Sequence, residues 1–317
     1  MRAFRGLTAA AALPALVLIG CGAAANPTPL PSVAPTATPE PRLPLIAAAG
    51  DISCAPGSRD PCRQEQTASV IEALDPDLVL PLGDNQYESG TLGEYSAVYN
   101  LSWGRLRQKS KPVPGNHEYQ DPSARGYYDY FNGPGAFSGV AGDRDRGYYS
   151  YDFGGWHFVA LNSNCGFIRG CGANSPQEVW LREDLRRNQL PCTLAYAHHP
   201  RFSSGVNGSS ANLQAIWQTL YEFNVDVYLC GHDHHYERFS PQRPDGAPDP
   251  VRGIREFVVG TGGRSITPFL TILPNSEVQD TSSFGVLAMR LGPGFYQWKF
   301  VATPGMPLAD TGTALCH

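Results

Sequence analysis

The sequence lacks any run of basic residues, and its overall charge is slightly acidic. It contains 24 lysine and arginine residues against 29 aspartate and glutamate residues, which gives a formal net charge of −5. Proteins that bind the phosphate backbone of nucleic acids normally carry a basic patch or stripe. The composition therefore indicates no nucleic-acid partner.

The sequence also lacks an apolar run of membrane-spanning length near its start. The N-terminal apolar stretch covers residues 7–19, which fits the core of a signal peptide better than a transmembrane helix. Gly20 stands directly before Cys21 at its end, an arrangement similar to the lipobox of bacterial lipoproteins. That resemblance implies a signal peptide over residues 1–20 and a lipidated Cys21. The alternative is an ordinary cleaved signal with an incidental cysteine.

Residues 21–42 consist largely of alanine, proline, threonine and serine. A segment of this composition cannot bury apolar area and is stiffened by proline, which predicts a semi-extended linker. Such a linker would hold a globular body away from a lipid anchor at the cell surface or the periplasmic face. No composition shift or repeat interrupts residues 43–317, so we expect one domain there rather than two.

Cysteine is present at eight positions, and an exported protein can oxidise its cysteines to disulfides. Cys230 lies within an apolar run and is expected to be a buried thiol. Two of the hypothesised pairs would close short loops, but the sequence alone does not determine connectivity. The three hypothesised pairs are Cys54–Cys62, Cys165–Cys171 and Cys192–Cys316.

The coarse secondary structure alternates between apolar runs and helix-like stretches. Residues 63–74 and a stretch that opens at Ser175 carry apolar residues on one face, which predicts helices. The pattern as a whole predicts a mixed α/β fold with two sheets. The runs that we expect to be strands cover residues 44–51, 78–84, 111–118, 147–162, 192–199, 225–232, 254–263 and 284–301.

Histidine is scarce, with eight residues in the chain, yet three of them fall within "GHDHHYER" at residues 231–238. These histidines either lie on a solvated turn or bind a metal. The second interpretation is favoured because six residues of metal-binding types each follow an apolar run, at the sheet edge where ligands bind in open α/β folds. These residues are Asp51, Asp84, Asn116, His198, His232 and His234.

Five blocks in this order resemble the signature of the calcineurin-like metallophosphoesterases. They are "GDIS" (50–53), "GDNQY" (83–87), "GNHEY" (115–119), "AYAHHP" (195–200) and "GHDHHYER" (231–238). The resemblance implies the metallophosphatase fold, a four-layer αββα sandwich of two mixed β-sheets flanked by helices, over a catalytic domain at residues 43–317. It also implies a phosphate ester hydrolase with a binuclear metal centre and a metal-bound hydroxide as nucleophile.

Departures from the general family pattern resemble the purple acid phosphatase branch. Ser53 stands where many members have a metal-binding histidine, and Tyr87 follows Asp84 by three residues. In that branch a tyrosinate binds the more oxidised iron, and a hard anionic phenolate favours Fe(III) over Fe(II). The alternative for Tyr87 is a loop aromatic packed on the core.

The resemblance implies two ligand sets that share Asp84 as a bridging carboxylate. One metal, expected to be Fe(III), takes Asp51, Tyr87 and His234. The other metal, which is Fe(II), Zn(II) or Mn(II), takes Asn116, His198 and His232.

Three further histidines stand beside these ligands. His117 is the candidate to donate a proton to the leaving group or to bind the phosphate. His199 and His235 are expected to contact the substrate phosphate, with supporting or exposed positions as the alternative. Some family members have histidines in the loop that corresponds to residues 201–210, but this chain has none. Its substrate preference and pH optimum are therefore open.

The function predicted from these features is an exported, lipid-anchored phosphomonoesterase that acts on small phosphate esters. A phosphodiesterase or nucleotidase with the same fold and metals is the alternative, and residues 201–210 are the region that would distinguish the two. A non-catalytic binding lipoprotein is disfavoured because no ligand position is missing.

Overall fold

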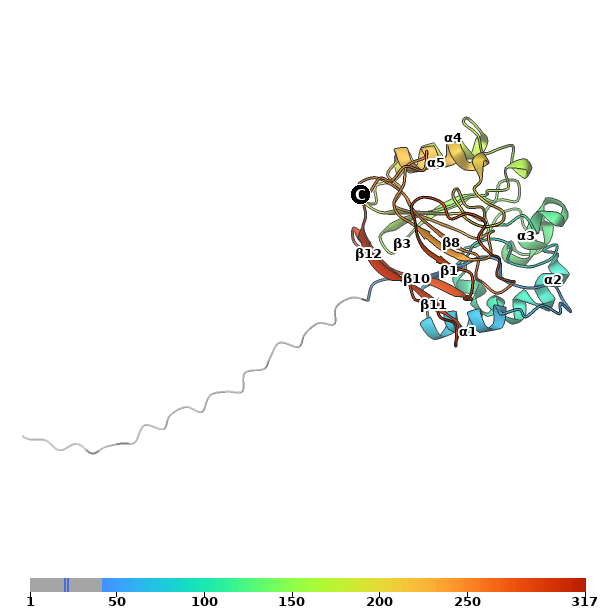
Figure 1. Cartoon of the computed structure of the whole chain (residues 1–317), viewed down its shortest axis with the longest axis horizontal. Coiled ribbons are helices and arrows are strands. Elements are labelled where there is room, and N and C mark those ends of the chain that lie inside the picture. The colour runs from blue at the N-terminus through green and yellow to red at the C-terminus, as the bar shows by residue number, and fades with distance from the viewer. Residues whose placement is uncertain (1–19, 21, 23–41) are drawn as a thin grey trace, which may run out of the picture. The chain divides into compact units, whose positions relative to one another are not determined.

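Residues 20, 22 and 42–317 are described by the structure, a computed structural model. The predicted signal peptide, Cys21 and nearly all of the linker lie outside the described residues. Residues 42–317 form one compact unit (Figure 1). No helix in the described part of the chain combines the length and the apolar character needed to cross a membrane.

Two β-sheets form the centre of this unit. Their strands are β1 (Leu45–Ala49), β2 (Leu78–Pro81), β3 (Tyr149–Phe153), β4 (Trp156–Ala160), β5 (Thr193–Tyr196), β6 (Val227–Cys230), β7 (Tyr236–Phe239), β8 (Arg255–Val259), β9 (Ser276–Asp280), β10 (Gly285–Gly292), β11 (Phe295–Ala302) and β12 (Thr311–Leu315). The strand orders are β12-β11-β10-β1-β2 and β3-β4-β5-β6-β8-β7-β9. In the first sheet β1 runs parallel to β2 and antiparallel to β10. In the second, β4, β5, β6 and β8 are mutually parallel, whereas β3 and β7 run antiparallel to them.

The larger sheet has a hydrophobic core on each face, because side chains along a strand point alternately to the two faces. In β4, Trp156 and Phe158 join the core shared with the smaller sheet, whereas Val159 joins the core on the opposite face. Leu181 and Trp217, from helices α4 (Pro176–Arg187) and α5 (Gln214–Glu222), belong to that second core.

Helices cover the outer faces of the two sheets. Helix α1 (Gln64–Leu74) contacts β10 and β11 of the smaller sheet. In Figure 1, α4 and α5 lie on one side of the strands and α1 on the other. Two shorter helices, α2 (Leu92–Ala97) and α3 (Arg125–Asn132), fill part of the long connection between β2 and β3. The predicted sandwich of two mixed sheets flanked by helices is confirmed.

Both predicted helices form, and local sequence explains where α4 begins. The Ser175 side chain accepts a hydrogen bond from the N–H of Glu178, and Pro176 occupies the first helical position. A hydroxyl cap followed by proline suits a helix start, because proline lacks the N–H that would otherwise be unsatisfied there.

Residues 111–118 do not form the predicted strand. Val113 is the one bridging residue of this segment, paired with Leu82, because Pro112 and Pro114 have no N–H to donate to a ladder. Lys111 and Val113 alternate with these prolines and donate to carbonyl oxygens of β2 at 2.9 and 3.0 Å. The segment therefore still runs beside β2 and carries the "GNH" residues to the same edge of the sheet.

The three hypothesised disulfides are confirmed. The bonded pairs are Cys54–Cys62, Cys165–Cys171 and Cys192–Cys316. Cys230 is a buried free thiol, as expected. Strands β9 and β12 were not anticipated, because their residues alternate between exposed and half-buried positions without an apolar run.

Candidate active site

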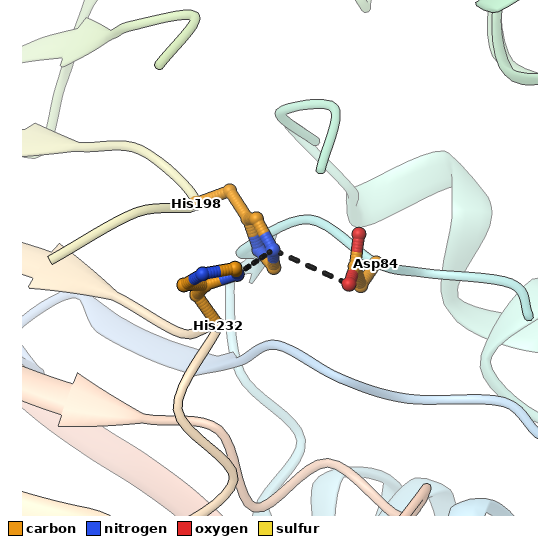
Figure 2. Close-up of side chains that lie close together, drawn as sticks. All are labelled: Asp84, His198 and His232. Atoms are coloured by element: carbon orange, nitrogen blue, oxygen red, sulfur yellow. Dashed lines mark hydrogen bonds and ion pairs between the residues drawn. The ribbon is translucent and has the colours of Figure 1, made fainter. Parts of the chain in front are cut away.

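The predicted ligand residues converge where the carboxyl ends of strands from both sheets meet. Asp51 and Asp84 follow β1 and β2 of the smaller sheet, and His198 and His232 follow β5 and β6 of the larger sheet. Figure 2 shows Asp84, His198 and His232 approaching one another from separate loops. Parallel neighbouring strands end at the same edge, which explains how distant sequence blocks reach one place.

Three of these residues have left-handed backbone conformations, which non-glycine residues rarely adopt. The φ angles are 59° at Asp51, 46° at Asp84 and 70° at His232. Such conformations cost on the order of 1–3 kcal/mol each and persist where the surrounding structure holds them, commonly at functional sites.

Glycines in the blocks allow the loops to approach closely. A Cβ atom on Gly115 would lie 2.1 Å from Oδ1 of Asp84. A Cβ on Gly83, where φ is 85°, would lie 2.6 Å from the Cβ of His198. Any larger residue at either position would therefore push Asp84 or His198 out of place.

One group of donor atoms surrounds the hydroxyl of Tyr87. This oxygen lies 2.9 Å from the carboxylate of Asp51, 3.0 Å from that of Asp84 and 3.0 Å from Nε2 of His234. His234 Nε2 is also 3.2 Å from Asp51 Oδ1. These four residues include all of the ligands predicted for the first metal.

A second group surrounds Nε2 of His198. This atom lies 3.3 Å from Asp84 Oδ2, 3.1 Å from Asn116 Oδ1 and 3.2 Å from His232 Nδ1. Potential ligand atoms of Asp84, His198 and His232 all lie within 4.8 Å of one another. Asp84 Oδ2 therefore faces both groups, because the Tyr87 hydroxyl is 3.0 Å from the same atom.

Burial and neighbouring charges shift the protonation of these groups in opposite directions. Burial alone would raise the pKa of Asp51, but His234 and His198 lower that pKa overall. Burial opposes a charged His198, yet the carboxylate of Asp84 raises the His198 pKa to about 9. Burial and the adjacent His198 together lower the pKa of His232 to about 4. The site therefore combines ionised carboxylates with a neutral imidazole at His232.

The donor set fits metal cations. Carboxylate, amide and phenol oxygens together with imidazole nitrogens are ligands of iron, zinc and manganese. The single O–H of Tyr87 faces the carboxylates of both Asp51 and Asp84 but can be donated to only one at a time. A cation bound beside Tyr87 would neutralise the negative charge of the carboxylate that receives no hydrogen bond from the hydroxyl.

His117 and His199 lie beside the two groups. His117 Nε2 is 3.9 Å from Asp84 Oδ2, and its ring centroid lies 4.3 Å from that of Tyr87. The ring of His199 is 4.3 Å from that of His232, and its Nδ1 is 2.7 Å from the hydroxyl of Ser163. Both histidines therefore border the place where a substrate would reach the candidate ligands.

The structure contradicts the prediction that His235 contacts the substrate. Its side chain is fully buried, with Nε2 3.4 Å from the Glu237 carboxylate and its ring against Phe269. The backbone bends between His234 and His235, since the N–H of His235 donates to the carbonyl of Asp233. This bend directs the two adjacent imidazoles to different surroundings.

Glu118 is a residue of the site that sequence reasoning missed. Its fully buried carboxylate accepts hydrogen bonds from the Tyr95 hydroxyl and from the N–H groups of Asp84, Asn85, Gln86 and Gly115. Burial and the nearby Asp84 raise the Glu118 pKa to about 7, despite these hydrogen bonds. Glu118 thus joins the loops that carry Asp84 and Asn116. Its position next to His117 in "GNHEY" was the only signal in the sequence.

Three buried carboxylates, from β7, β8 and the loop between β6 and β7, hold residues 201–208. Glu256 accepts from the N–H of Arg201 at 2.7 Å. Asp233 accepts from the Ser203 hydroxyl at 2.5 Å, and from the N–H groups of residues 207 and 208. Glu237 accepts from the Ser204 hydroxyl and N–H. A rigid loop therefore borders His232, and no local pattern in its own sequence indicates this.

Residues that follow the glycine-rich segment "GTGG" (260–263) also reach the site. The hydroxyl of Ser265 is 2.7 Å from Nδ1 of His234. Arg264 lies 5.2 Å above the Tyr87 ring and forms ion pairs with Asp60 and Glu88. Ser265 thus orients a candidate ligand from the side opposite Tyr87.

The amino-acid sequence of this chain is similar to sequences of known proteins. A model of the calcineurin-like phosphoesterase family matches residues 44–236. Purple acid phosphatase 15 of Arabidopsis thaliana is 28% identical over 260 residues, which cover 72% of this chain and 47% of that protein. A probable inactive purple acid phosphatase 9 from the same plant is 27% identical over 249 residues, covering 65% of this chain and 37% of its own. This chain thus spans about half the length, or less, of these curated relatives.

Solved structures share the fold. The purple acid phosphatase PPD1 from yellow lupin (Lupinus luteus) superposes with a TM-score of 0.69 at 20% identity, covering 86% of this chain and 53% of that one. A structure of PhoD superposes with a TM-score of 0.58 at 15% identity, covering 87% of this chain and 70% of that one. At these sequence identities the structural similarity shows a shared fold and nothing more.

Proposed function

Because the chain belongs to the calcineurin-like phosphoesterase family and is similar to purple acid phosphatases, we propose that it hydrolyses phosphate monoesters at a binuclear metal centre. The observation that carries this proposal is the position of Asp84, whose Oδ2 lies 3.0 Å from the Tyr87 hydroxyl and 3.3 Å from His198 Nε2. One carboxylate oxygen between an oxygen-rich group and a nitrogen-rich group suits two neighbouring cations.

In this proposal Asp51, Tyr87 and His234 hold one metal, Asn116, His198 and His232 hold the other, and Asp84 bridges them. Two bound metal ions would lower the pKa of water and neutralise charge on the phosphoryl oxygens. Fe(III) is proposed beside Tyr87, because a phenolate is a hard anionic ligand. Fe(II), Zn(II) or Mn(II) is proposed at the second position.

His117 is proposed to protonate the leaving oxygen through Nε2. Its Nδ1 lies 2.5 Å from the carbonyl oxygen of Glu88, which can only accept, and 3.0 Å from the side-chain amide of Gln120, which can accept through its oxygen. Nδ1 therefore carries a hydrogen, and Nε2 is the atom that can exchange a proton with the substrate.

His199 is proposed to bind a phosphate oxygen through its Nε2–H. The Ser163 hydroxyl oxygen accepts from the backbone N–H of His199 at 2.9 Å, so its own hydrogen is available to Nδ1 of the ring. Burial and the nearby His198 hold the His199 pKa well below its usual value, which keeps the ring neutral. A neutral ring that accepts at Nδ1 must carry its hydrogen at Nε2.

We further propose that the protein is exported and anchored by lipid at Cys21, with its catalytic unit outside the cytoplasm. The basic start, the apolar stretch over residues 7–19 and the cysteine after Gly20 support this localisation. Small phosphate esters outside the cytoplasm would then be its substrates.

The decisive experiment uses residues 42–317, which form one compact unit. Hydrolysis of an aryl phosphate monoester and of the matching diester would be measured, with metal content determined on the same sample. We expect about two metal ions per chain and a clear preference for the monoester. Comparable or faster turnover of the diester would instead favour a phosphodiesterase on the same fold.

Asn116→Ala and His232→Ala are expected to lose metal and activity together, by on the order of 100-fold in kcat/KM, because each removes a proposed ligand. His317→Ala, at the C-terminus, is the matched control and should retain both. Full turnover by either ligand variant would mean that the reaction takes place elsewhere.

A further inference from the structure

A groove leads away from the candidate site along the disulfide-bonded loop at residues 165–171. One pocket of about 260 Å³ is lined by His199, His232 and residues 207–212. A second pocket, of about 730 Å³, lies between that loop and residues 211–218. Both are lined by Ala211 and Asn212, so the two pockets adjoin. We call this second pocket the side groove.

The side groove carries three amide side chains among apolar and small residues, and no charged side chain lines it in the described part of the chain. Its described lining contains the amides of Asn212, Gln214 and Gln218, and no lysine, arginine, aspartate or glutamate. The pocket beside the histidines adds Asn207, together with two serines, and likewise contains no lysine or arginine. Binding of additional phosphate or carboxylate groups would call for such cations. Gln214 already accepts a hydrogen bond from Arg201, and Gln218 donates one to Glu222, both from outside the lining. Amides and hydroxyls both donate and accept, which matches the hydroxyl groups of a ligand.

Small residues give the side groove its width. Glycine and alanine contribute most of the remaining lining. The volume falls within the range of about 300–1,000 Å³ that is usual for small-molecule sites. The groove therefore has room for a group considerably larger than phosphate itself.

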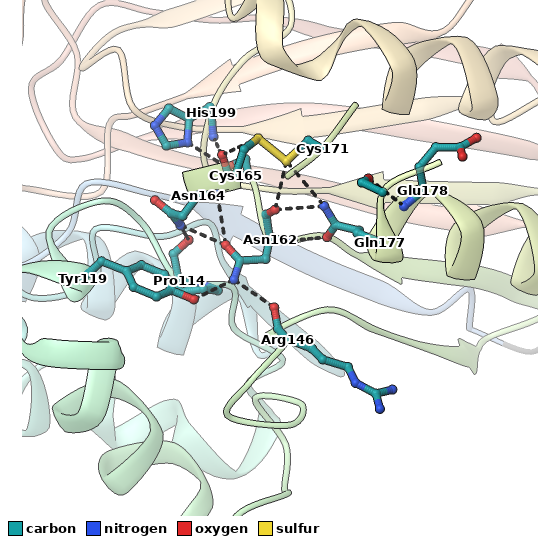
Figure 3. The surroundings of a disulfide bond; sticks show 12 residues. Pro114, Tyr119, Arg146, Asn162, Asn164, Cys165, Cys171, Gln177, Glu178 and His199 are labelled. Atoms are coloured by element: carbon teal, nitrogen blue, oxygen red, sulfur yellow. Dashed lines mark hydrogen bonds between the residues drawn. A yellow bond between two sulfur atoms is a disulfide. The ribbon is translucent and has the colours of Figure 1, made fainter. Parts of the chain in front are cut away.

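One wall of the side groove is fixed to the candidate site. Figure 3 shows the Cys165–Cys171 disulfide between His199 and Gln177. Asn162, just before the loop, exchanges hydrogen bonds with the Gln177 side chain at 2.8 and 3.0 Å. Asn164 donates to the carbonyl of Pro114 at 3.0 Å, next to the "GNH" residues. The groove is thus preformed at a set position relative to the proposed ligands.

We propose that the side groove binds the leaving group of the substrate, and that this group is an uncharged, polyhydroxylated unit such as a glycosyl group. This inference rests on the proposed function, since it assumes that the phosphoryl group is held near His199 and His232. Polyanionic esters fit the groove poorly, because no lysine or arginine among its described lining residues would neutralise their additional phosphates.

The test compares kcat/KM for trehalose 6-phosphate, phenyl phosphate and ATP, using residues 42–317. Trehalose 6-phosphate is expected to be the best of the three substrates and ATP the poorest. Ala215→Trp places a large side chain in the side groove and should lower kcat/KM for trehalose 6-phosphate by about tenfold while leaving phenyl phosphate within about twofold. Ala97→Trp, at an exposed alanine in α2, is the matched control and should change neither.

Preference for ATP, or an equal effect of Ala215→Trp on both monoesters, would overturn the inference. Gln218→Ala removes a groove amide without adding bulk and should raise KM for trehalose 6-phosphate alone, which keeps the test valid if Ala215→Trp does not fold.

Saturation-transfer NMR with trehalose detects binding in the side groove independently of turnover. Absence of all phosphatase activity with trehalose still bound would refute the proposed function but not the groove. Activity on phenyl phosphate without any trehalose contact would refute the groove alone.

Discussion

At the scale of single residues, Asp84 connects every part of the candidate site. Its Oδ1 accepts the N–H of His117 at 2.9 Å, and its Oδ2 faces both Tyr87 and His198. Burial opposes ionisation, but His198 and His117 hold the Asp84 pKa well below its usual range. Asp84 is therefore an anion before any cation binds, which removes the energetic cost of deprotonation from metal binding.

Tyr87→Phe is expected to abolish visible absorption after loading with Fe(III). Burial and the carboxylates of Asp51 and Asp84 raise the Tyr87 pKa well above its usual value, so the phenol ionises at neutral pH only beside a compensating cation. The wild-type protein loaded with iron should show a tyrosinate band in the visible spectrum. Tyr130→Phe, which changes a phenol bonded to Asn100, should leave the band intact. A colourless, fully active protein that contains only zinc or manganese would refute the iron assignment.

Glu118→Gln should lower both stability and metal content. The amide has one oxygen in place of two, so several of the N–H groups of residues 84–86 and 115 lose their acceptor. We expect a loss of about 1–3 kcal/mol in the free energy of unfolding, and a decrease of about tenfold or more in metal affinity. Urea denaturation and metal titration would measure these effects. Glu183→Gln, at an exposed position in α4, is the control, and equal behaviour of the two variants would contradict the assigned role.

At the scale of secondary-structure elements, His157 joins two strands to a helix. Its Nδ1 lies 2.8 Å from Asp152 of β3, and its Nε2 lies 2.9 Å from Asp184 of α4. Burial would lower the His157 pKa, but the two carboxylates raise it above its usual value. The protonated ring therefore stabilises the attachment of the β3–β4 hairpin to α4.

His157→Gln should destabilise the protein more in mild acid than in alkali. The folded pKa lies above the unfolded value of about 6.5, so this stabilisation is fully present below about pH 6.5 and is lost as pH rises through the folded pKa. Urea denaturation at about pH 6 and about pH 9 would show a larger gap between variant and wild type at the lower pH. Asp152→Asn, which removes one carboxylate partner, should reduce this pH dependence, whereas a gap that is constant with pH would contradict the assignment.

At the scale of the whole molecule, a disulfide joins the ends of two sheets. Cys192 directly precedes β5 of the larger sheet, and Cys316 directly follows β12 of the smaller one. The bond closes a sequence separation of 124 residues, against 8 for Cys54–Cys62. Long closed loops restrict the unfolded chain most, so this bond should contribute most to stability.

Replacing both Cys192 and Cys316 by serine should lower the free energy of unfolding by about 5 kcal/mol, compared with about 2.5 kcal/mol for the Cys54/Cys62 double serine variant, in the chain-entropy model. Guanidinium denaturation of both variants measures the difference. Cys192 precedes β5 whereas His198 follows it, so the disulfide and the candidate site lie at opposite ends of this strand. We therefore expect kcat/KM for an aryl phosphate to change little at low temperature. Equal losses in the two variants would show that loop length does not determine this stabilisation.

The sequence by itself determined the features that depend on neighbouring residues. Apolar runs followed by glycine predicted most strands and the edge where Asp51, Asp84, His198 and His232 meet. The hydroxyl of Ser175 before Pro176 predicted the start of α4, since a cap acts within one turn. The prolines at 112 and 114 were also visible in the sequence, and the physical rule against proline in a ladder could have corrected the predicted strand over residues 111–118.

Only the tertiary structure decided which buried groups face each other. Glu118 differs little from other glutamates in the sequence, yet its carboxylate accepts N–H groups from loops that lie about 30 residues apart in the chain. His235 follows His234 directly, but a backbone bend directs it into the core beside Glu237. The side groove likewise depends on two segments that meet only after folding. Burial and long-range contacts set these outcomes, and both come from the packing of the two sheets rather than from local sequence preference.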